Sequence, residues 1–514
     1  MDKLLDEAKL SKQLDMPIYE DNWNSNTIKR DFTPRLELQT KCGKITDLES
    51  AIKSAGLKDG MTISFHHHFR NGDKILNMVM DKLAGMGFKN LQIAPSSLSE
   101  VHSPLIKHIQ NGVVTRIQTS GLRGELAEAI SHGLMENPVI FRSHGGRAAA
   151  IANKQLHIDL AFIGASSCDY LGNANGYSRE KEKSICGSLG YAKVDAEYAD
   201  KVIILTDSLV AYPNVPVAIS EKHVDYIVSV EEVGDATKIA SGAIKETKNP
   251  HDILIAQTAA QVVEFGGFFY DGFSLQTGSG GASLACTQYI REAMIRKNVK
   301  ARFALGGITS HMVQLHEEGL IGKLLDVQSF DMVAARSLKN NRFHQQICAN
   351  IYANPYQQGS AIHWLDVVML SALEVDVNFN VNVLTGSDGV IRGAIGGHPD
   401  TACGAALSIV LCPLTRGRIP CVVEKVTTLI TPGSFVDVIV TDQGVAVNPA
   451  RPEVAKRLKK AGIKIVSIED LKAKAEKILG KPDELPFGDK VVGVVTSPDN
   501  AILDLIYQIK AVEE

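Results

Sequence analysis

Short apolar segments of strand length recur along the chain and alternate with longer segments of helical periodicity. Residues 61–65 (MTISF), 201–206 (KVIILT) and 435–441 (FVDVIVT) are of the first kind. Many such segments are almost continuously apolar, which is typical of strands covered on both faces. Residues 73–86 (DKILNMVMDKLAGM) have the period of an amphipathic helix. The pattern predicts an α/β fold with mostly parallel sheets.

Two stretches of the chain, residues 59–97 and 271–309, follow the same order of elements. Each begins with an Asp-Gly turn and continues through a strand, a polar loop, a helix, a basic turn and a second strand. Lys89 and Lys300 precede the second strands at nearly the same offset. A repeat of this length predicts two tandem homologous α/β lobes.

The 514 residues of the chain exceed what one hydrophobic core normally organises, which agrees with two lobes. The predicted division is a helical N-terminal extension over residues 1–30, a first lobe over 31–236, and a second lobe with a C-terminal segment over 237–514. The join is expected near residues 231–243, between a strand-like segment and a helical one.

Charge and cysteine usage narrow the class of protein. Lys plus Arg number 54 against 58 Asp plus Glu, a formal charge of −4, so nucleic acid is not an expected partner. We find neither a signal peptide nor an apolar stretch long enough to cross a bilayer, and no membrane partner is expected. The eight cysteines form no CxxC pair, which favours reduced thiols in a cytoplasmic protein.

Loops rich in Gly, His and Arg follow several predicted strands, where ligands bind in open α/β sheets. The segment 64–73 (SFHHHFRNGD) occupies this position in the first repeat, and 277–283 (TGSGGAS) in the second. Glycine loops let backbone N–H groups approach an anion, and the arginine fork suits carboxylates. Each loop could also be a plain structural turn. Further candidates lie in residues 141–151 (FRSHGGRAAAI), 162–176 (FIGASSCDYLGNANG) and 394–408 (AIGGHPDTACGAALS).

Three adjacent histidines raise the question of a metal site. Their side chains cannot converge on one ion from an extended loop without unusual backbone geometry, and Asp73 is the one close carboxylate. We therefore expect no metal there. Alternation along the segment predicts that His66 and His68 point to one side and His67 to the other.

The glycine loop, residues 305–312 (LGGITSHM) and the segments at 141–151, 162–176 and 394–408 together resemble the CoA-transferase superfamily. Within it, the chain most resembles the citrate lyase alpha subunit family. This resemblance implies two NagB/RpiA-like lobes and the exchange of acetate for citrate on a carrier thioester, giving citryl-carrier and acetate from acetyl-carrier and citrate. A separate beta subunit would then cleave the citryl thioester.

The resemblance also implies the partners and co-substrate. The carrier would be a gamma subunit bearing a phosphoribosyl-dephospho-CoA arm, for which acetyl-CoA can substitute, and no cofactor would be bound covalently to this chain. A homo-oligomer is expected.

Three groups of site residues are expected from the motifs and the resemblance. Citrate carries about three negative charges near neutral pH, so its pocket needs cations in a protein that is acidic overall. The predicted catalytic group is Ser310, His311, Gly397, His398 and Asp400. The predicted substrate-binding group is His66, His68, Arg70, Ser143, His144, Arg147, Asp169 and Asn173, with Arg392 as a further arginine. The predicted thioester-arm group is Thr277, Gly278, Ser279, Gly280, Gly281, Gly306 and Gly307.

One departure from the superfamily bears on mechanism. Many relatives carry a catalytic glutamate in a segment resembling HTEM, where this chain reads ITSHM. A carboxylate nucleophile is therefore expected to be absent, unless Glu317 or Glu318 takes its place. The favoured route is direct attack of a citrate carboxylate within a ternary complex, through a mixed anhydride.

Three other functions remain open from sequence alone. The chain could be a CoA-transferase or acyl-CoA hydrolase that uses free CoA, which donor preference would reveal. It could be a non-catalytic sensor of acyl-CoA or sugar phosphates, because fold does not fix function. A metal-dependent hydrolase using residues 66–68 would contain bound zinc.

Overall fold

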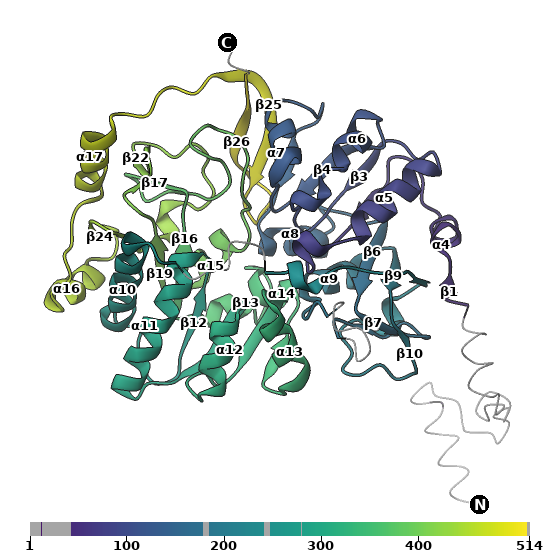
Figure 1. The fold of residues 1–514 in the computed structure, drawn as a ribbon, viewed down its shortest axis with the longest axis horizontal. Helices are drawn as coiled ribbons and strands as arrows, with labels where there is room; N and C mark the ends of the chain where they lie inside the picture. The colour runs from purple at the N-terminus through teal and green to yellow at the C-terminus, as the bar shows by residue number, and fades with distance from the viewer. Residues whose placement is uncertain (1–11, 13–42, 178–184, 241–246, 279, 511–514) are drawn as a thin grey trace, which may run out of the picture. The chain divides into compact units, whose positions relative to one another are not determined.

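The computed structural model describes residues 12, 43–177, 185–240, 247–278 and 280–510 (Figure 1). The predicted N-terminal extension lies outside the described residues, apart from Lys12. The same holds for Ser279 of the glycine loop.

The first lobe is built on a ten-stranded sheet. Nine neighbouring strands of this sheet pair in parallel, and the tenth, at the edge, pairs antiparallel. In spatial order its strands are β1 (Ile45–Thr46), β11 (Tyr226–Ser229), β9 (Lys201–Thr206), β6 (Leu160–Ala165), β2 (Thr62–Ser64), β3 (Leu91–Ile93), β4 (Val114–Thr119), β5 (Val139–Phe141), β25 (Phe487–Thr496) and β26 (Ile502–Ile509). Its helices are α4 (Leu48–Ala55), α5 (Ile75–Gly85), α6 (Leu105–Gln110), α7 (Gly124–Ser131), α8 (His144–Ala152) and α9 (Gly190–Tyr198).

The second lobe is built on an eight-stranded sheet that ends in one antiparallel pair. In spatial order its strands are β15 (His344–Gln346), β14 (Leu324–Ser329), β13 (Ala301–Ile308), β12 (Phe273–Thr277), β16 (Val367–Ser371), β19 (Leu407–Leu411), β23 (Val438–Thr441) and β24 (Gly444–Val447). Its helices are α10 (Pro250–Phe265), α11 (Gly281–Lys297), α12 (Ser310–Glu317), α13 (Met332–Asn340), α14 (Ala349–Ala353), α15 (His398–Gly404), α16 (Pro452–Lys460) and α17 (Ile468–Leu479).

Three small sheets decorate the lobes. They consist of β7 (Ser167–Asp169), β8 (Ala174–Asn175) and β10 (Leu209–Val210); of β17 (Glu374–Asp376), β18 (Val381–Asn382) and β22 (Val422–Val423); and of β20 (Thr415–Arg416) with β21 (Ile419–Pro420).

The predicted repeat is visible in both topology and local bonds. The order β11-β9-β6-β2-β3-β4-β5 of the first sheet matches β23-β19-β16-β12-β13-β14-β15 of the second. Asp59 accepts a hydrogen bond from the Lys89 N–H at 2.9 Å, and Asp271 accepts one from the Lys300 N–H at 3.0 Å. The same Asp-Gly turn therefore begins each repeat, and the prediction of an α/β fold with mostly parallel sheets is confirmed.

The end of the chain returns to the first lobe. Strand β25 pairs in parallel with β5 and antiparallel with β26, so residues 487–509 extend the first sheet rather than the second. The sequence placed this segment with the second lobe because it follows that lobe in the chain. The predicted boundary at residue 236 stays a prediction.

A continuous apolar core joins the two lobes. One cluster of buried side chains includes Ile63 and Val139 of the first sheet together with Val368 and Ile439 of the second. Gly145 lies so close to the second lobe that a Cβ atom built there would be 1.9 Å from the Ala353 carbonyl oxygen. The two lobes therefore pack against each other as one body.

Candidate functional site

A cavity of about 310 Å³ lies between the two lobes. Its walls include Ser97, Thr277, Gly307 and Ser371, which lie at or just beyond the carboxyl ends of β3, β12, β13 and β16. Backbone bonds close the seam beside it: the His144 N–H donates to the Gly396 oxygen at 2.8 Å, and the Ile395 N–H to the Ser120 oxygen at 2.7 Å. The cavity therefore occupies the position where ligands bind in open α/β sheets, and both lobes build it.

Basic and hydroxyl groups dominate the polar lining. Arg70, Arg123 and three histidines line the cavity, and none of the described lining residues is an aspartate or a glutamate. Arg70 keeps its positive charge at neutral pH, although desolvation lowers its pKa to about 10. Arg123 is an exposed side chain at the rim. The composition suits a ligand with several carboxylates.

The histidine segment confirms the predicted alternation but reverses the side that faces the cavity. The rings of His66 and His68 are near-parallel, with centroids 6.5 Å apart, on the side away from the cavity. His67 lines the cavity and is stacked on Tyr191 at 4.9 Å, while its Nδ1 contacts Ser96 Oγ at 2.6 Å. Burial and the neighbouring cations hold the pKa of His67 well below its usual value.

Arg70 is held by an aromatic ring from the other lobe. Its guanidinium carbon lies 4.1 Å from the centre of the Phe330 ring, and its backbone has a φ of +50°, a region that non-glycine residues seldom occupy. A Cβ atom on Gly307 would lie 2.0 Å from Cζ of Phe330, so only glycine admits the ring there. The sequence could place Arg70 in a loop, but not its partner 260 residues away.

The predicted citrate contact Arg147 is engaged elsewhere. Its guanidinium donates two hydrogen bonds of 2.8 Å to the carboxylate of Asp195, which also contacts His66 Nε2 at 2.9 Å. Burial alone would raise the pKa of Asp195, but Arg147 and His66 outweigh it and hold that pKa below its usual range. Arg147, His66 and Asp195 form a buried ion-pair cluster behind the cavity wall.

Asp400 connects the second lobe to the beginning of helix α8. It accepts hydrogen bonds from Ser143 Oγ at 2.6 Å and from the Gly145 N–H at 2.8 Å. Burial raises the pKa of Asp400 to about 7, against the effect of these two bonds. Ser143 and Asp400 do not line the cavity, but they hold His144, which does. Asp400 is thus placed to position the wall rather than to touch a ligand.

His398 is the predicted catalytic histidine that the structure places at the cavity. Its Nδ1 contacts Thr431 Oγ1 at 2.7 Å, which fixes the ring. Burial lowers the pKa of His398 to about 4 and that of His144 to about 3, so both rings are neutral at pH 7. Gly397 also lines the cavity, and a Cβ atom there would lie 2.5 Å from the Tyr352 hydroxyl.

The glycine loop brings the beginning of the 17-residue helix α11 to the cavity. Thr277, Gly278 and Gly280 line it, and the first N–H groups of a helix have no partner within the helix. The Gly278 N–H is already used, because it donates to the Met369 oxygen at 2.9 Å. Gly281 and Gly306 are not part of the lining. The helix dipole and the free N–H groups favour a negative charge here.

Several predicted residues lie outside the cavity. Asp169 accepts hydrogen bonds from the N–H groups of residues 171–173 and from the Asn173 side chain, so the pair shapes its own loop. The Ser310 N–H donates to Asp331 Oδ2 at 2.7 Å as α12 begins, and neither Ser310 nor His311 is in the lining.

The two glutamates considered as substitute nucleophiles also lie elsewhere. Glu318 pairs with Arg291 on the surface, at 2.5 Å, and Glu317 lines a separate open depression. Both occur at the end of α12 opposite to the carboxyl edge of the sheet. Arg392 is 56% exposed, pairs with Asp388 and is absent from the lining.

Sequence reasoning missed residues that carry little local signal. They include one exposed arginine, two tyrosines and a phenylalanine in segments with no recognisable motif, and two glutamines inside strands. These are Arg123, Tyr191, Gln276, Gln328, Phe330 and Tyr352.

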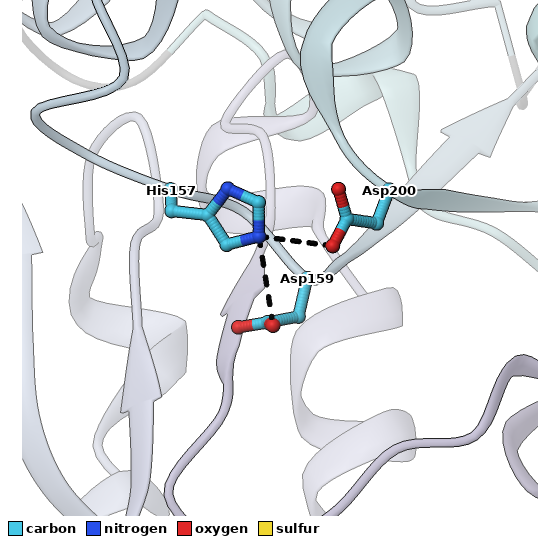
Figure 2. A group of neighbouring side chains, drawn as sticks. All are labelled: His157, Asp159 and Asp200. Carbon is cyan, nitrogen blue, oxygen red and sulfur yellow. Dashed lines mark hydrogen bonds and ion pairs between the residues drawn. The ribbon is translucent and has the colours of Figure 1, made fainter.

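A possible cation-binding group lies far from the cavity. Among the described residues, only His157, Asp159 and Asp200 bring three ligand atoms within 4.8 Å of one another (Figure 2). His157 Nε2 lies 2.9 Å from Asp200 Oδ2 and 3.7 Å from Asp159 Oδ1. The two aspartates precede β6 and β9, at the edge of the sheet opposite to the cavity, and the segment 66–68 contributes nothing to the group.

Two further features concern the cysteines and the length of the helices. The seven cysteines in the described ranges are free thiols. No helix in those ranges is long and apolar enough to cross a membrane.

Comparisons with known proteins identify the family of the chain. Residues 42–509 match the family model of the citrate lyase alpha subunit. Citrate lyase alpha chains of Haemophilus influenzae and Escherichia coli are 58% and 57% identical over 465 and 464 residues, covering 90% of this chain and 92% and 90% of theirs.

Solved structures extend the comparison. A putative citrate lyase alpha subunit from Streptococcus mutans, solved in complex with citrate, is 55% identical with a TM-score of 0.89, covering 91% of this chain and 92% of that one. A malonate decarboxylase alpha subunit from Acinetobacter baumannii, 15% identical with a TM-score of 0.61 over 87% of this chain and 95% of that one, shares the fold. The chain belongs to the citrate lyase alpha subunit family.

Proposed function

We propose that this chain exchanges acetate for citrate on the thioester of an acyl-carrier protein, converting acetyl-carrier and citrate into citryl-carrier and acetate. The observation that carries the proposal is the interlobe cavity, which offers arginine, histidine and helix N–H groups and has no carboxylate among its described lining residues. A tricarboxylate and an acyl thioester both need such a pocket, because negative charge must be held and also develops during transfer.

The proposed chemistry is a direct exchange within a ternary complex. A carboxylate oxygen of citrate attacks the acetyl carbonyl carbon, the carbon–sulfur bond breaks, and the carrier leaves as a thiolate. The thiolate then attacks the citryl carbonyl of the mixed anhydride, and acetate leaves. No proton is gained or lost in the sum, so the protein need only position reactants and stabilise charge.

Positioning and charge stabilisation can account for a large part of the reduction in the activation barrier. Holding two reactants correctly can supply ~7–11 kcal/mol, and each well-placed oxyanion donor about 2.7–4 kcal/mol. Arg70 and the rings of His67, His144 and His398 surround the space for citrate, and the beginning of α11 provides backbone donors. Ser310, His311, Asp400 and Ser143 support the walls in this proposal and do not touch the reacting atoms.

No described carboxylate is placed to act as a covalent nucleophile, since Asp400, Glu317 and Glu318 lie outside the cavity lining. We therefore expect that borohydride or hydroxylamine, added during turnover, traps no glutamyl adduct on the protein. A stable adduct would overturn the anhydride route while leaving the overall exchange intact.

The proposed co-substrate is a carrier-borne phosphoribosyl-dephospho-CoA thioester, with acetyl-CoA as a surrogate, and no cofactor is bound covalently to this chain. Family membership implies a citrate lyase complex. We propose that its partners are a lyase beta subunit and a carrier gamma subunit, that the chain forms a homo-oligomer, and that it works in the cytoplasm.

The test is a transfer assay with purified protein, acetyl-carrier or acetyl-CoA, and labelled citrate. Arg70→Gln should raise the citrate KM about 10-fold to 100-fold, because it removes charge-assisted hydrogen bonds. Arg392→Gln is the matched control, since that arginine is exposed and outside the cavity, and should leave the KM unchanged. Failure of the unmodified protein to form citryl thioester would refute the function, and strong preference for free CoA over carrier would favour the free-CoA alternative.

A further inference from the structure

The repeat places two equivalent strands on the two lobes. Strand β10 pairs in parallel with β7, Val210 lying opposite Asp169. Strand β22 pairs in parallel with β17, Val423 lying opposite Asp376. The aspartates are themselves equivalent, because each organises a turn with an asparagine four residues later. The structure that covers β22 therefore indicates what kind of structure fits on β10.

In the second lobe, an amphipathic helix covers β22. Helix α17 packs on β22 and β21 (Figure 1). Its buried face consists of Ile468, Leu471 and Ala475. Under it, Val422 and Val423 are 0% and 8% exposed. An ion pair between Lys472 of the helix and Glu424, the residue after β22, fixes the edge of this contact.

In the first lobe, the equivalent surface has no helix on it within the described ranges. Both residues of β10 are only half-buried, where those of β22 are buried. The chain then continues through Tyr212, Val215 and Val217, which are 53%, 67% and 44% exposed. We call residues 209–217 the apolar ledge. Neighbouring apolar side chains that are this exposed mark interaction sites more often than single ones do.

The ledge is held rigidly although it is exposed. The Asn214 N–H donates to Asp169 Oδ2 at 3.0 Å, and its side chain donates to the Asn173 oxygen at 3.0 Å. Asn175 Nδ2 donates to the Pro216 oxygen at 3.0 Å. Asp169 and Asn173, predicted from sequence as ligand contacts, thus fix the backbone that presents the exposed side chains. A pre-ordered surface loses little entropy on binding.

The charges beside the ledge are mainly positive. A hollow of about 190 Å³ next to Val217 is lined by Lys193 and Lys222, with Glu197 as its one described carboxylate. His223 also lines it, but desolvation and the neighbouring Lys222 lower the pKa of this ring, which is therefore neutral at pH 7. An occupant with acidic residues along the margin of its apolar face would complement these groups, as Lys472 and Glu424 complement each other in the second lobe.

We propose that the apolar ledge binds an amphipathic helix with an acidic margin, contributed by another subunit of the citrate lyase complex, in the manner in which α17 covers β22. The proposal rests on the proposed function for the identity of the complex. The ledge is on α9's side of the first lobe, outside the cavity lining, so it is an assembly surface rather than part of the reacting site.

The experiment uses the full chain with purified lyase and carrier subunits. The variant V215D/V217D places two charges on the ledge without burying them, and K222E reverses a neighbouring charge. I295D is the matched control, because Ile295 is 54% exposed on α11 of the other lobe. Binding is measured by analytical ultracentrifugation with each subunit separately, and transfer from acetyl-CoA to citrate by the uncomplexed chain is measured in parallel.

We expect V215D/V217D to raise the Kd for one of the two subunits at least tenfold, K222E to raise the same Kd by a smaller factor, and I295D to change neither. Transfer from acetyl-CoA should be equal in all four proteins. Unchanged Kd values in an active V215D/V217D variant would overturn the proposal. So would dissociation of a homo-oligomer by this variant with subunit binding unchanged, since the occupant would then be a second copy of this chain. Loss of transfer in the unmodified protein would refute the proposed function instead.

Discussion

The buried cluster of Asp195, Arg147 and His66 allows a test of the role of Arg147. We infer that this arginine stabilises the fold and does not bind citrate. The perturbation is Asp195→Asn, which keeps the shape of the side chain and removes its charge. Asp195 is fully buried and receives both arms of the Arg147 guanidinium, whose side chain is 6% exposed. The change therefore leaves a buried cation without its counter-charge.

Removing one partner of a buried ion pair typically costs about 3–5 kcal/mol of stability. Because the two lobes share one core, the unit that unfolds is the whole body of roughly 470 residues. An unfolding entropy of about 2.1 cal/mol/K per residue then makes each kcal/mol lower the thermal midpoint by about 1 °C. We therefore expect Asp195→Asn to lower the midpoint by ~3–5 °C. Because the pKa of Asp195 is held below its unfolded value, its stabilising effect is complete above pH ~4 and is lost only as the pH falls further.

The assay is calorimetric unfolding of the purified chain, with Asp200→Asn as the control. Asp200 is 60% exposed and pairs with His157 on the surface, so its loss should change stability by no more than ~0.5 kcal/mol. The reasoning is refuted if Asp195→Asn unfolds at the same temperature as Asp200→Asn. Unchanged stability combined with a raised citrate KM would indicate instead that Arg147 binds citrate.

Two further outcomes follow from contacts around the cavity. Gly307→Ala should displace Phe330 and its stacked Arg70, lowering kcat/KM for citrate at least tenfold in steady-state assays, whereas Gly85→Ala, with open space around it, should have no effect. The folded pKa of Asp400 of about 7 lies above the unfolded value of 3.8, so the unmodified protein should lose up to ~4 kcal/mol of stability between pH 4 and pH 8. Asp400→Asn should abolish that component of the pH dependence in calorimetric scans, and an unchanged slope would contradict the assignment.

The fold could be predicted from the sequence because each repeat carries its own local signals. The Asp-Gly turns at Asp59 and Asp271 close onto Lys89 and Lys300 in the same way, and almost continuously apolar strands indicate parallel sheets. The pairing of residues 487–509 with the first sheet was not accessible, because it joins segments more than 340 residues apart in the chain. Nothing in the local pattern of a strand specifies such a distant neighbour.

The candidate site could be predicted from the sequence only in part, for a similar reason. Sequence identified the loops that reach the cavity, including Arg70, His144, the glycine loop and His398. It could not show that His66 and Arg147 are bound to Asp195, or that His67 rather than its neighbours faces the ligand space. Alternation fixes which residues share a side, whereas packing against the other lobe decides which side is inward.

A crystal structure of this protein at saturating citrate tests the central claim most directly. The expected result is citrate in the interlobe cavity, with carboxylate oxygens within hydrogen-bond reach of Arg70 and of backbone N–H groups at the beginning of α11, and with Arg147 still bound to Asp195. Citrate bound elsewhere, or held by Arg147 after release from Asp195, would contradict it.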